Sequence, residues 1–272
     1  MTFGQPLPVL MYHHVSPVPG LVTCSPENFR EQMRWLAESG WNTLSNTQFE
    51  DAIETGNFPE KSVLITFDDG YLDNWVYAYP ILKEFGLRAT LFVVTGWLGD
   101  GDIRPVFGQA DIPEILSHGK SKVAVREGRF DEAFLRWSEV NRMREEGVFD
   151  FHSHTHSHVR WDKKEIDASK RVDLLATDLE QSQATLMTRL GIRSKHLCWP
   201  QGYFEAAYQR VACEAGFSYL YTTEHGVTGK ETDPLRIPRV VAKDKARDYF
   251  SRRMNIYGSK WLSRPYLFLK QS

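Results

Sequence analysis

The chain has 272 residues, of which 42% are hydrophobic and 25% are charged, the composition of an ordinary globular protein. A formal net charge of −2 provides no basic field for nucleic acid, and the apolar run at 89–99 is too short to span a bilayer. The first ten residues lack the basic start of a signal peptide, so we expect a cytoplasmic protein. Cys24, Cys198 and Cys213 follow no disulfide or zinc-knuckle spacing, and we expect reduced thiols in the core.

Helix and strand signals begin near the N-terminus. Residues 9–12 are apolar and predict a first strand. Ser25 before Pro26 predicts the start of a helix, because serine caps helices and proline suits the first helical position. Thr47 and Glu50 have the spacing of a capping box, which predicts the start of a second helix.

The following segments predict an α/β protein. Residues 63–67 and 91–94 are continuously apolar, as strands covered on both faces are. Five amphipathic stretches end in a glycine that precedes a β-rich run, at Gly40, Gly86, Gly147, Gly191 and Gly216. Repeated helix–glycine–strand units are typical of a mainly parallel sheet. With seven or eight strands in the chain, we expect a barrel, and a single domain over residues 1–272.

Residues 97–136 interrupt this alternation. The segment contains glycines and charges of both signs with little periodicity, and it precedes a helix predicted at 137–146. Segments of this length without periodicity are usually functional or mobile. Because it follows the strand at 91–94, we expect this insertion at the C-terminal face of the barrel, either as a lid over the site or as a surface addition with its own small core. A C-terminal extension is expected from about residue 243.

Two adjacent carboxylates, Asp68 and Asp69, follow the apolar strand at 63–67. The turn at the end of a strand can bring both into one pocket, where one pKa rises unless a cation neutralises the pair. A bound divalent metal would be such a cation. The alternative is a surface Asp-Asp-Gly turn, which is common.

Four histidines alternate at positions 152, 154, 156 and 158. The His-x-x-x-His spacing therefore occurs in two registers, 152/156 and 154/158. One carboxylate and two imidazoles leave a coordination position open for water, as catalytic zinc sites do, and the other carboxylate would be free to act as a base. The alternative is a polar loop whose histidines bind metal only adventitiously.

These motifs resemble those of the polysaccharide deacetylase family, carbohydrate esterase family 4, which is also called the NodB homology domain. Residues 66–70 (TFDDG) match the first motif of the family in full. His154-Thr155-x-x-His158 matches the second motif, and the preceding residues 150–153 resemble the usual lead-in to that motif, which selects the register 154/158 over 152/156. Residues 198–202 resemble the third motif and 235–239 the fifth, and the opening residues 8–15 are similar to the branch that contains poly-N-acetylglucosamine deacetylases.

The resemblance implies a distorted (β/α)7 TIM-like barrel that removes an acetyl group, most often N-acetyl, from a sugar or glycan precursor. It implies that Asp68 is the general base. It further implies that Asp69, His154 and His158 hold a divalent metal, with Zn²⁺ favoured over Co²⁺, Ni²⁺ or Mn²⁺. Six residues would line the substrate pocket: Thr155, Trp199, Pro200, Gln201, Gly202 and Tyr203.

Three positions depart from the family pattern. The third motif often begins with an arginine that orients the base, and here that position is Cys198. The fifth motif often ends in a histidine that acts as the general acid, and here that position is Arg239, which cannot deliver a proton near neutral pH. The proline that usually follows the second metal histidine is Val159.

Another histidine is therefore expected to supply the acid. His13 and His14 end the first predicted strand and could reach the barrel mouth, and His156 and His225 are further candidates. We favour His13.

Two other functions fit the sequence. The changed third and fifth motifs are compatible with a non-catalytic carbohydrate-binding protein on a decayed deacetylase barrel, although the intact Asp68 argues against it. A deformylase or another amide hydrolase on the same scaffold is the second alternative.

Overall fold

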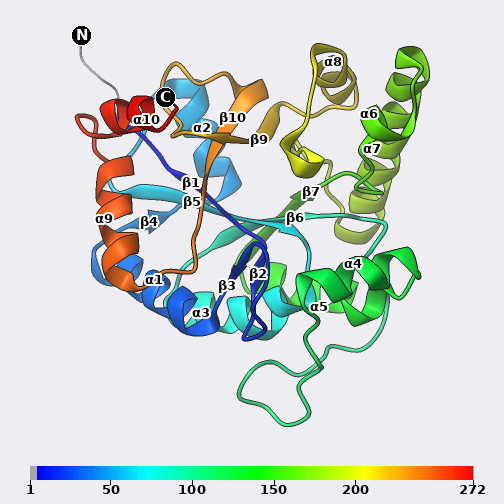
Figure 1. Ribbon diagram of the computed structural model, residues 1–272, viewed down its shortest axis with the longest axis horizontal. Coiled ribbons are helices and arrows are strands. Elements are labelled where there is room, and N and C mark those ends of the chain that lie inside the picture. The colour runs from blue at the N-terminus through cyan, green and yellow to red at the C-terminus, as the bar shows by residue number, and fades with distance from the viewer. Residues whose placement is uncertain (1–4, 272) are drawn as a thin grey trace.

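The computed structural model describes residues 5–271, and parallel strands form its centre (Figure 1). β1 (Val9–Tyr12) pairs with β5 (Ser62–Asp69), and the order continues through β6 (Ala89–Val93), β7 (Phe149–Ser153), β8 (His196–Cys198), β9 (Tyr219–His225) and β10 (Ile237–Val241). β10 pairs with β1 and closes the ring. Among residues 5–271, seven strands thus form a closed parallel barrel, which confirms the predicted distorted (β/α)7 fold.

The remaining elements surround this ring. β4 (Asn42–Thr43) pairs only with the start of β5, and β2 (His14–Val15) pairs with β3 (Thr23–Cys24). The α-helices are α1 (Pro26–Glu38), α2 (Asn46–Thr55), α3 (Tyr79–Glu84), α4 (His118–Arg126), α5 (Trp137–Glu145), α6 (Trp161–Lys164), α7 (Ala168–Leu190), α8 (Ala206–Glu214), α9 (Arg247–Tyr257) and α10 (Ser263–Gln271). Short turns of other helix types are η1 (Asn74–Ala78), η2 (Phe130–Glu132), η3 (Pro200–Gly202) and η4 (Pro234–Arg236).

The first two helices begin with serine caps. The Ser25 side chain accepts a hydrogen bond from the backbone N–H of Asn28, as expected for the start of α1. The capping box of α2 is formed by Ser45 and Gln48, so the prediction that placed it at Thr47 and Glu50 is wrong. Ser45 is the last extended residue before the helix, and only from that position does a side chain reach the free N–H groups of the first turn.

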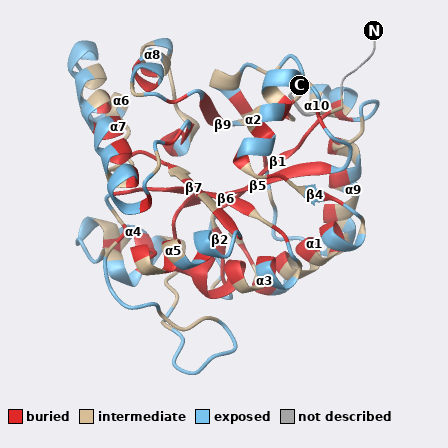
Figure 2. Ribbon diagram, turned by 180° about the vertical axis from the view of Figure 1, so that it is seen from behind, coloured by how far each residue is buried: buried red, intermediate tan, exposed pale blue. Residues whose placement is uncertain are grey.

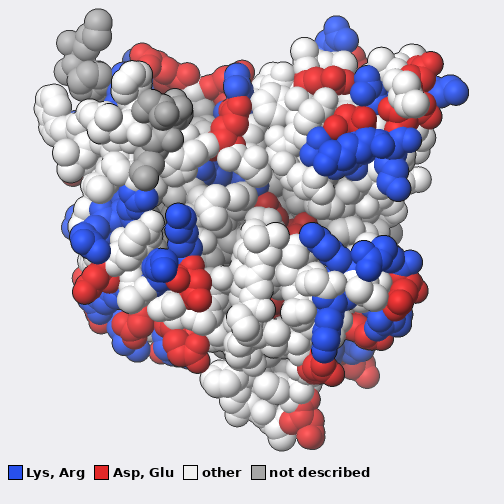
Figure 3. Space-filling model, viewed as in Figure 1, with Lys and Arg blue, Asp and Glu red and all other residues white. Residues whose placement is uncertain are grey.

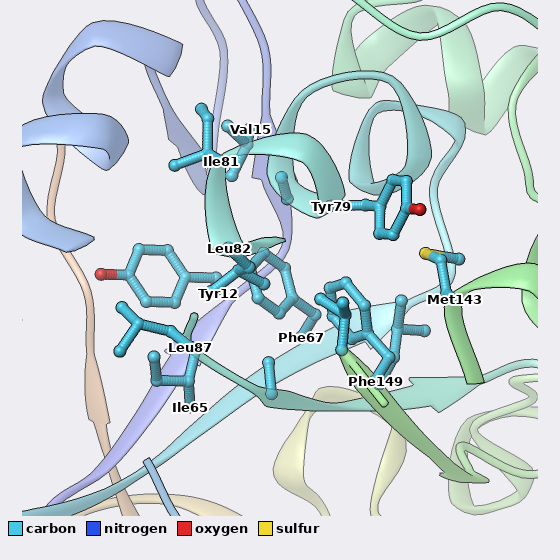
Figure 4. Packing of buried hydrophobic residues seen from close by; sticks show 14 of the residues in the cluster. Tyr12, Val15, Ile65, Phe67, Tyr79, Ile81, Leu82, Leu87, Met143 and Phe149 are labelled. Carbon is cyan, nitrogen blue, oxygen red and sulfur yellow. The ribbon is translucent and has the colours of Figure 1, made fainter. Parts of the chain in front are cut away.

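β5 is buried along its whole length because alternate residues face the helices and the barrel interior. Ile65 and Phe67 belong to the outer hydrophobic cluster, where Phe67 packs edge-on against Phe149 (Figure 4). Leu64 belongs to the interior cluster. The same alternation places Asp68 on the interior side at the C-terminal end of the strand.

α2 closes the opposite end of the barrel. Its Phe49 is fully buried and packs in the interior cluster with Phe92 and Tyr221. Figure 2 shows the strands as the buried centre and the outer faces of the helices as exposed. Because apolar side chains fill the N-terminal end, the polar interior residues are concentrated toward the C-terminal end, where α/β barrels carry their sites.

The insertion at 97–136 has a small core of its own. Phe134 packs with Tyr71 and Ala124, and Trp97 and Phe130 lie against them. Part of the segment leaves the barrel as an exposed loop, which projects at the bottom of Figure 1. One part of the insertion, which includes α4, therefore packs through this small core against Tyr71, and another part is an exposed loop.

Two further expectations concern cysteines and membranes. Cys24 and Cys198 are buried free thiols, but Cys213 is exposed, so the expectation of three core thiols is wrong for Cys213, which ends up on the outer side of α8. Among the described residues, no helix is long and apolar enough to cross a bilayer.

Candidate active site

Asp68 is held at the barrel mouth by an arginine from β10, which is separated from β5 by β1 alone. Nη1 of Arg239 donates to Oδ1 of Asp68 at 2.7 Å and Nη2 donates to Oδ2 at 2.8 Å. Arg239 also donates from Nε to the carbonyl of Thr222 and from Nη2 to the Cys198 sulfur at 3.1 Å. Asp68 and Arg239 are 2% and 1% exposed, so this bidentate pair is shielded from water and fixes the carboxylate plane.

Asp69 points in another direction because the strand ends in a left-handed turn. Its φ is 75°, a region in which aspartate is several-fold enriched over most residues. Its Oδ1 lies 3.3 Å from Nε2 of His154 and 3.4 Å from Nε2 of His158. The consecutive aspartates therefore occupy adjacent but different positions, one tied to Arg239 and one facing two imidazoles.

The chemistry of this cluster fits a divalent metal. Oδ1 of Asp69 is buried and has no hydrogen-bond partner, which is costly unless a cation or donor satisfies it. Nδ1 of His154 donates to the Cys198 carbonyl at 2.7 Å, which leaves its Nε2 as a lone pair aimed at Asp69, the orientation that metal-binding histidines require. Asp69, His154 and His158 offer three ligand atoms within 4.8 Å of one another.

The two histidines lie on an irregular turn rather than on a helix. Thr155 and His158 have φ values of 67° and 57°. The Thr155 hydroxyl accepts from the His158 N–H, and the Ser153 hydroxyl accepts from the Thr155 N–H. These local bonds hold a backbone conformation that costs energy, as is common at functional sites, and bring the two imidazole rings to a centroid distance of 4.8 Å.

For each of the two aspartates, burial raises the pKa and the neighbouring side chains lower it. Burial alone would raise the pKa of Asp68, but the Arg239 guanidinium outweighs it and holds the pKa below its usual value. Burial likewise opposes ionisation of Asp69, but the neighbouring imidazoles of His154 and His158 hold the pKa of Asp69 far below its usual value. Burial lowers the pKa of His158 to about 4. Both carboxylates are therefore ionised and His158 is neutral near pH 7.

His13 lies beside the predicted base. Its Nε2 is 3.8 Å from Oδ2 of Asp68, and its side chain is 19% exposed. Asn74 fixes its backbone by donating from Nδ2 to the His13 carbonyl at 2.8 Å. Burial lowers the pKa of His13, although Asp68 and Asp69 act in the opposite sense.

The other three candidates for the acid lie elsewhere. His14 is buried against Asp73, with Nδ1 2.6 Å from Oδ2. His156 bonds to the hydroxyl of Thr95 at 3.0 Å, and His225 lies beside Tyr257 of α9. Of the four histidines considered from sequence, His13 is the one that faces Asp68.

The third motif forms the turn η3 after β8. Pro200 is buried, and Gly202 fits because any side chain there would meet Thr223, whose Oγ1 would be 2.1 Å from a Cβ. Gln201 has a φ of 55° and accepts from Arg160, whose guanidinium lies 4.2 Å over the ring of Tyr203. Gln201 and Tyr203 are thus joined through Arg160 at the surface.

Two of the predicted pocket residues are deeply buried. Trp199 is 1% exposed and packs with Tyr208 in the layer between the barrel and α7 and α8. Thr155 is also 1% exposed. Their assignment to the acetyl pocket stays a prediction, as do those of Pro200, Gln201, Gly202 and Tyr203.

The face at which these strands end is hollowed. Figure 3 shows acidic side chains within the recess near its centre and Lys and Arg side chains around it. Acidic side chains inside the recess suit a bound cation, and the basic side chains surround the entrance to the recess.

The role of Arg239 was not predicted from sequence. Its position in the fifth motif was interpreted as a lost acid, whereas the structure places its guanidinium on Asp68, where the missing arginine at position 198 would be expected to act. The two departures from the family pattern could have indicated this contact, because the small thiol of Cys198 in the third motif leaves room for the long side chain of Arg239 in the fifth. The sequence did not reveal that the two positions are neighbours.

Comparison with known proteins agrees with this geometry. Residues 55–220 match the family model described as polysaccharide deacetylase. The chain belongs to the polysaccharide deacetylase family. Its relatives include enzymes named as N-deacetylases, which hydrolyse a carbon–nitrogen bond that is not a peptide bond.

Two curated relatives illustrate the range of similarity. A Bacillus subtilis protein named as a polysaccharide deacetylase, YxkH, is 38% identical over 116 residues, which span 42% of this chain and only 40% of that protein. The poly-beta-1,6-N-acetyl-D-glucosamine N-deacetylase of Staphylococcus aureus is 25% identical over 242 residues, which span 87% of this chain and 73% of the relative.

Solved structures establish the fold of this family member. The Streptococcus pyogenes deacetylase PplD, in complex with acetate, has a TM-score of 0.73 and 21% identity, with 92% of this chain and 98% of that chain covered. IcaB from Ammonifex degensii has a TM-score of 0.72 and 22% identity, with 94% and 98% covered. Both matches extend over the barrel and well beyond residues 55–220.

Proposed function

We propose that this protein is a zinc-dependent N-deacetylase that acts on N-acetylated hexosamine units of a polysaccharide or glycan precursor. One observation carries the proposal. An unpaired, buried carboxylate oxygen of Asp69 faces two imidazole nitrogens, and the adjacent carboxylate of Asp68 is ionised and held in a fixed plane. This arrangement has one set of ligands and one separate base. A divalent ion on Asp69, His154 and His158 would supply Lewis-acid polarisation of the acetyl carbonyl.

Asp68 acts as the general base. Its bidentate pair with Arg239 keeps the carboxylate ionised and oriented, and each oxygen retains a lone pair that Arg239 does not occupy. Asp68 accepts the proton from the water that attacks the acetyl carbon. Arg239 does not donate a proton in this scheme, and its role is to position Asp68.

His13 supplies the proton for the leaving amine. It is the imidazole next to Asp68 and remains partly open to solvent, so it can both meet a substrate nitrogen and exchange protons with water. Because burial lowers its pKa, His13 starts neutral. It takes up the proton that Asp68 removed from the water and passes it to the leaving nitrogen as the C–N bond breaks. In a His13→Ala variant the basic limb of the pH–rate profile should move or disappear, and an unaltered profile would assign the acid to another group.

The substrate class is supported by the staphylococcal relative, which is named for its action on poly-beta-1,6-N-acetyl-D-glucosamine. A partner of this kind is a neutral glycan, in keeping with a protein whose net charge is −2. The cytoplasmic location stays a prediction.

The decisive experiment measures acetate release from N-acetylglucosamine oligomers by the full chain loaded with zinc. Release from N-acetylated oligomers, lost on chelation and restored by zinc, is the expected result. The same assay is run with O-acetylated and N-formylated sugars. Formate release without acetate release would favour the deformylase alternative, and oligomer binding without any release would favour the non-catalytic carbohydrate-binding protein.

A further inference from the structure

A second group of polar side chains lies beside the cluster formed by Asp69, His154 and His158. It consists of His14, Tyr71, Asp73 and His118, of which only His14 lies in a segment that carries the family resemblance. His118 is the first residue of α4 and comes from the insertion. The insertion therefore places an imidazole at the edge of the proposed metal site.

Asp73 anchors this group. Its Oδ2 is 2.6 Å from Nδ1 of His14, and its Oδ1 accepts from the backbone N–H of Val15 at 3.1 Å and from Nδ2 of Asn74 at 2.9 Å. Asp73 and His14 are each 1% exposed. The carboxylate accepts from three donors without contact with water, so it holds the His14 ring in one orientation.

His118 is joined to His14 and to Tyr71. Its Nδ1 lies 3.2 Å from Nε2 of His14 and 3.4 Å from the hydroxyl of Tyr71. The Tyr71 ring stacks on His14 at a centroid distance of 3.7 Å. Tyr71 follows Asp69 and Gly70 at the end of β5, so its contacts with His14 and His118 connect this group to the proposed metal site.

The hydrogen-bond partners assign the tautomers. His14 gives its Nδ1–H to Asp73, so its Nε2 is an acceptor and takes the Nδ1–H of His118. The Tyr71 oxygen accepts from the same Nδ1–H. Nε2 of His118 is then a lone pair, it has no hydrogen-bond partner among the described residues, and it is not among their buried unpaired atoms. Since His118 is only half-buried, this acceptor is open to solvent.

We propose that His118 is a substrate-positioning residue whose Nε2 accepts a hydrogen bond from a hydroxyl group of the sugar bound at the Asp69, His154 and His158 cluster. Asp73 and His14 serve to fix the orientation of its ring. This inference rests on the proposed deacetylase function and gives the insertion a defined part in recognition.

The electrostatics separate this role from that of a general acid. Burial and the charge of Lys122 lower the pKa of His118 to about 4, so the ring is neutral near pH 7 and has no proton to deliver from Nε2. An acceptor of this kind suits a sugar hydroxyl, which is a neutral donor.

The first test separates KM from kcat in a His118→Ala variant of the full zinc-loaded chain. Loss of one substrate hydrogen bond should raise KM for N-acetylglucosamine oligomers roughly 2- to 10-fold, with kcat little changed. Hydrolysis of a small aryl acetate, which has no sugar hydroxyl, should be unaltered. Lys120→Ala, an exposed change on the same helix, is the matched control and should leave both substrates unaffected. His118→Gln retains an acceptor and should recover part of the loss.

The second test identifies the hydroxyl. Oligomers in which single hydroxyl groups are replaced by hydrogen are compared in wild type and in His118→Ala. One deoxy substrate should show a raised KM in wild type and no further change in the variant. Equal oligomer KM values for wild type and His118→Ala, or a loss of equal size for the aryl acetate, would overturn the proposal. Failure of the deacetylase function itself would be visible separately, as no acetate release by the wild-type protein.

Discussion

The barrel contains two polar clusters built from the same kinds of residues. The mouth cluster consists of Asp68, Asp69, His154, His158 and Arg239. The floor cluster consists of Glu50, His152, Ser194, His196 and Tyr221. Each has two imidazoles, with two carboxylates at the mouth and one at the floor, and His152 and His154 are two residues apart at the end of β7. The clusters differ in whether their polar atoms are satisfied.

In the floor cluster both nitrogens of His196 are paired, with the Tyr221 hydroxyl at 3.0 Å and with Glu50 at 2.9 Å. His152 bonds to Ser194 at 2.8 Å. In the mouth cluster, by contrast, an oxygen of Asp69 is buried without a partner. A satisfied network makes a rigid core, whereas the unpaired acceptor needs a ligand. The comparison teaches that the unpaired atoms, and not the residue types, distinguish a binding site from a structural one.

The largest effect should come from the metal ligands. Asp69→Ala and His158→Ala remove one of three ligands, so each should lose bound zinc and acetate release together. His152→Ala, from the floor cluster, should keep one zinc per chain and wild-type turnover. Metal content by elemental analysis and acetate release, measured on the same samples, check both results. Retained metal in His158→Ala with loss in His152→Ala would show that the register 154/158 is wrong.

The next effect separates the base from the ligands within the mouth cluster. Asp68→Asn keeps the volume of the side chain but cannot accept a proton, and kcat should fall on the order of 10²- to 10⁴-fold. Zinc content and oligomer binding should persist, because Asp69 and both histidines are intact. Single-turnover acetate release with metal analysis tests this. Undiminished kcat in a zinc-loaded Asp68→Asn protein would remove Asp68 from the mechanism.

Much of the mouth cluster was predictable from local pattern. Asp68 and Asp69 follow an apolar strand, and the end of a parallel strand in a barrel is where functional side chains gather. The lead-in to the second motif selected His154 and His158, the two histidines that lie beside Asp69 in the structure. These features depend on residues close together in sequence, so strand periodicity and spacing are sufficient to reveal them.

The contacts between residues far apart in the sequence were not predictable. Arg239 reaches Asp68 although 171 residues separate them, and whether the two meet depends on strand order, register and barrel closure. His118 lies in a segment without periodicity, so nothing in the sequence places it beside His14. Burial patterns likewise do not tell which of the alternating histidines, His152 or His154, finds partners for its nitrogens.

The Arg239 contact leads to a pH prediction. Arg239→Met removes the charge that holds the pKa of Asp68 low, and burial, which acts in the opposite sense, then raises that pKa. The acid limb of kcat/KM, which in wild type lies below the usual aspartate range near 3.9, should therefore move to higher pH. An unpaired buried charge should also destabilise the fold by about 3–5 kcal/mol, measured by urea unfolding at pH 7.

A second-site change sharpens this test. Cys198 lies 3.1 Å from Nη2 of Arg239, so in the double variant Cys198→Arg with Arg239→Met a guanidinium from β8 can reach Asp68 instead. The acid limb and the stability should return toward wild type. If the double variant is no better than Arg239→Met, the position of the arginine on β10 is itself required.

The smallest effect on activity, and the clearest contrast with the mouth cluster, should come from titration of the floor cluster. Burial lowers the pKa of His152 and of His196. Between these lowered values and about 6.5, the unfolded chain binds protons that the folded chain does not. The free energy of unfolding should therefore decrease as the pH falls below 6.5, by up to about 1.4 kcal/mol per pH unit for each histidine.

His152→Gln removes one such proton and should flatten the dependence of the unfolding free energy on pH between pH 6.5 and 5, without changing turnover at pH 7. Thr177→Ala, an exposed change on α7, should leave this pH dependence as it is. Urea unfolding across this range gives the slope, and identical slopes in wild type and His152→Gln would mean that His152 takes up its proton inside the folded barrel, so that the floor cluster does not stay neutral there.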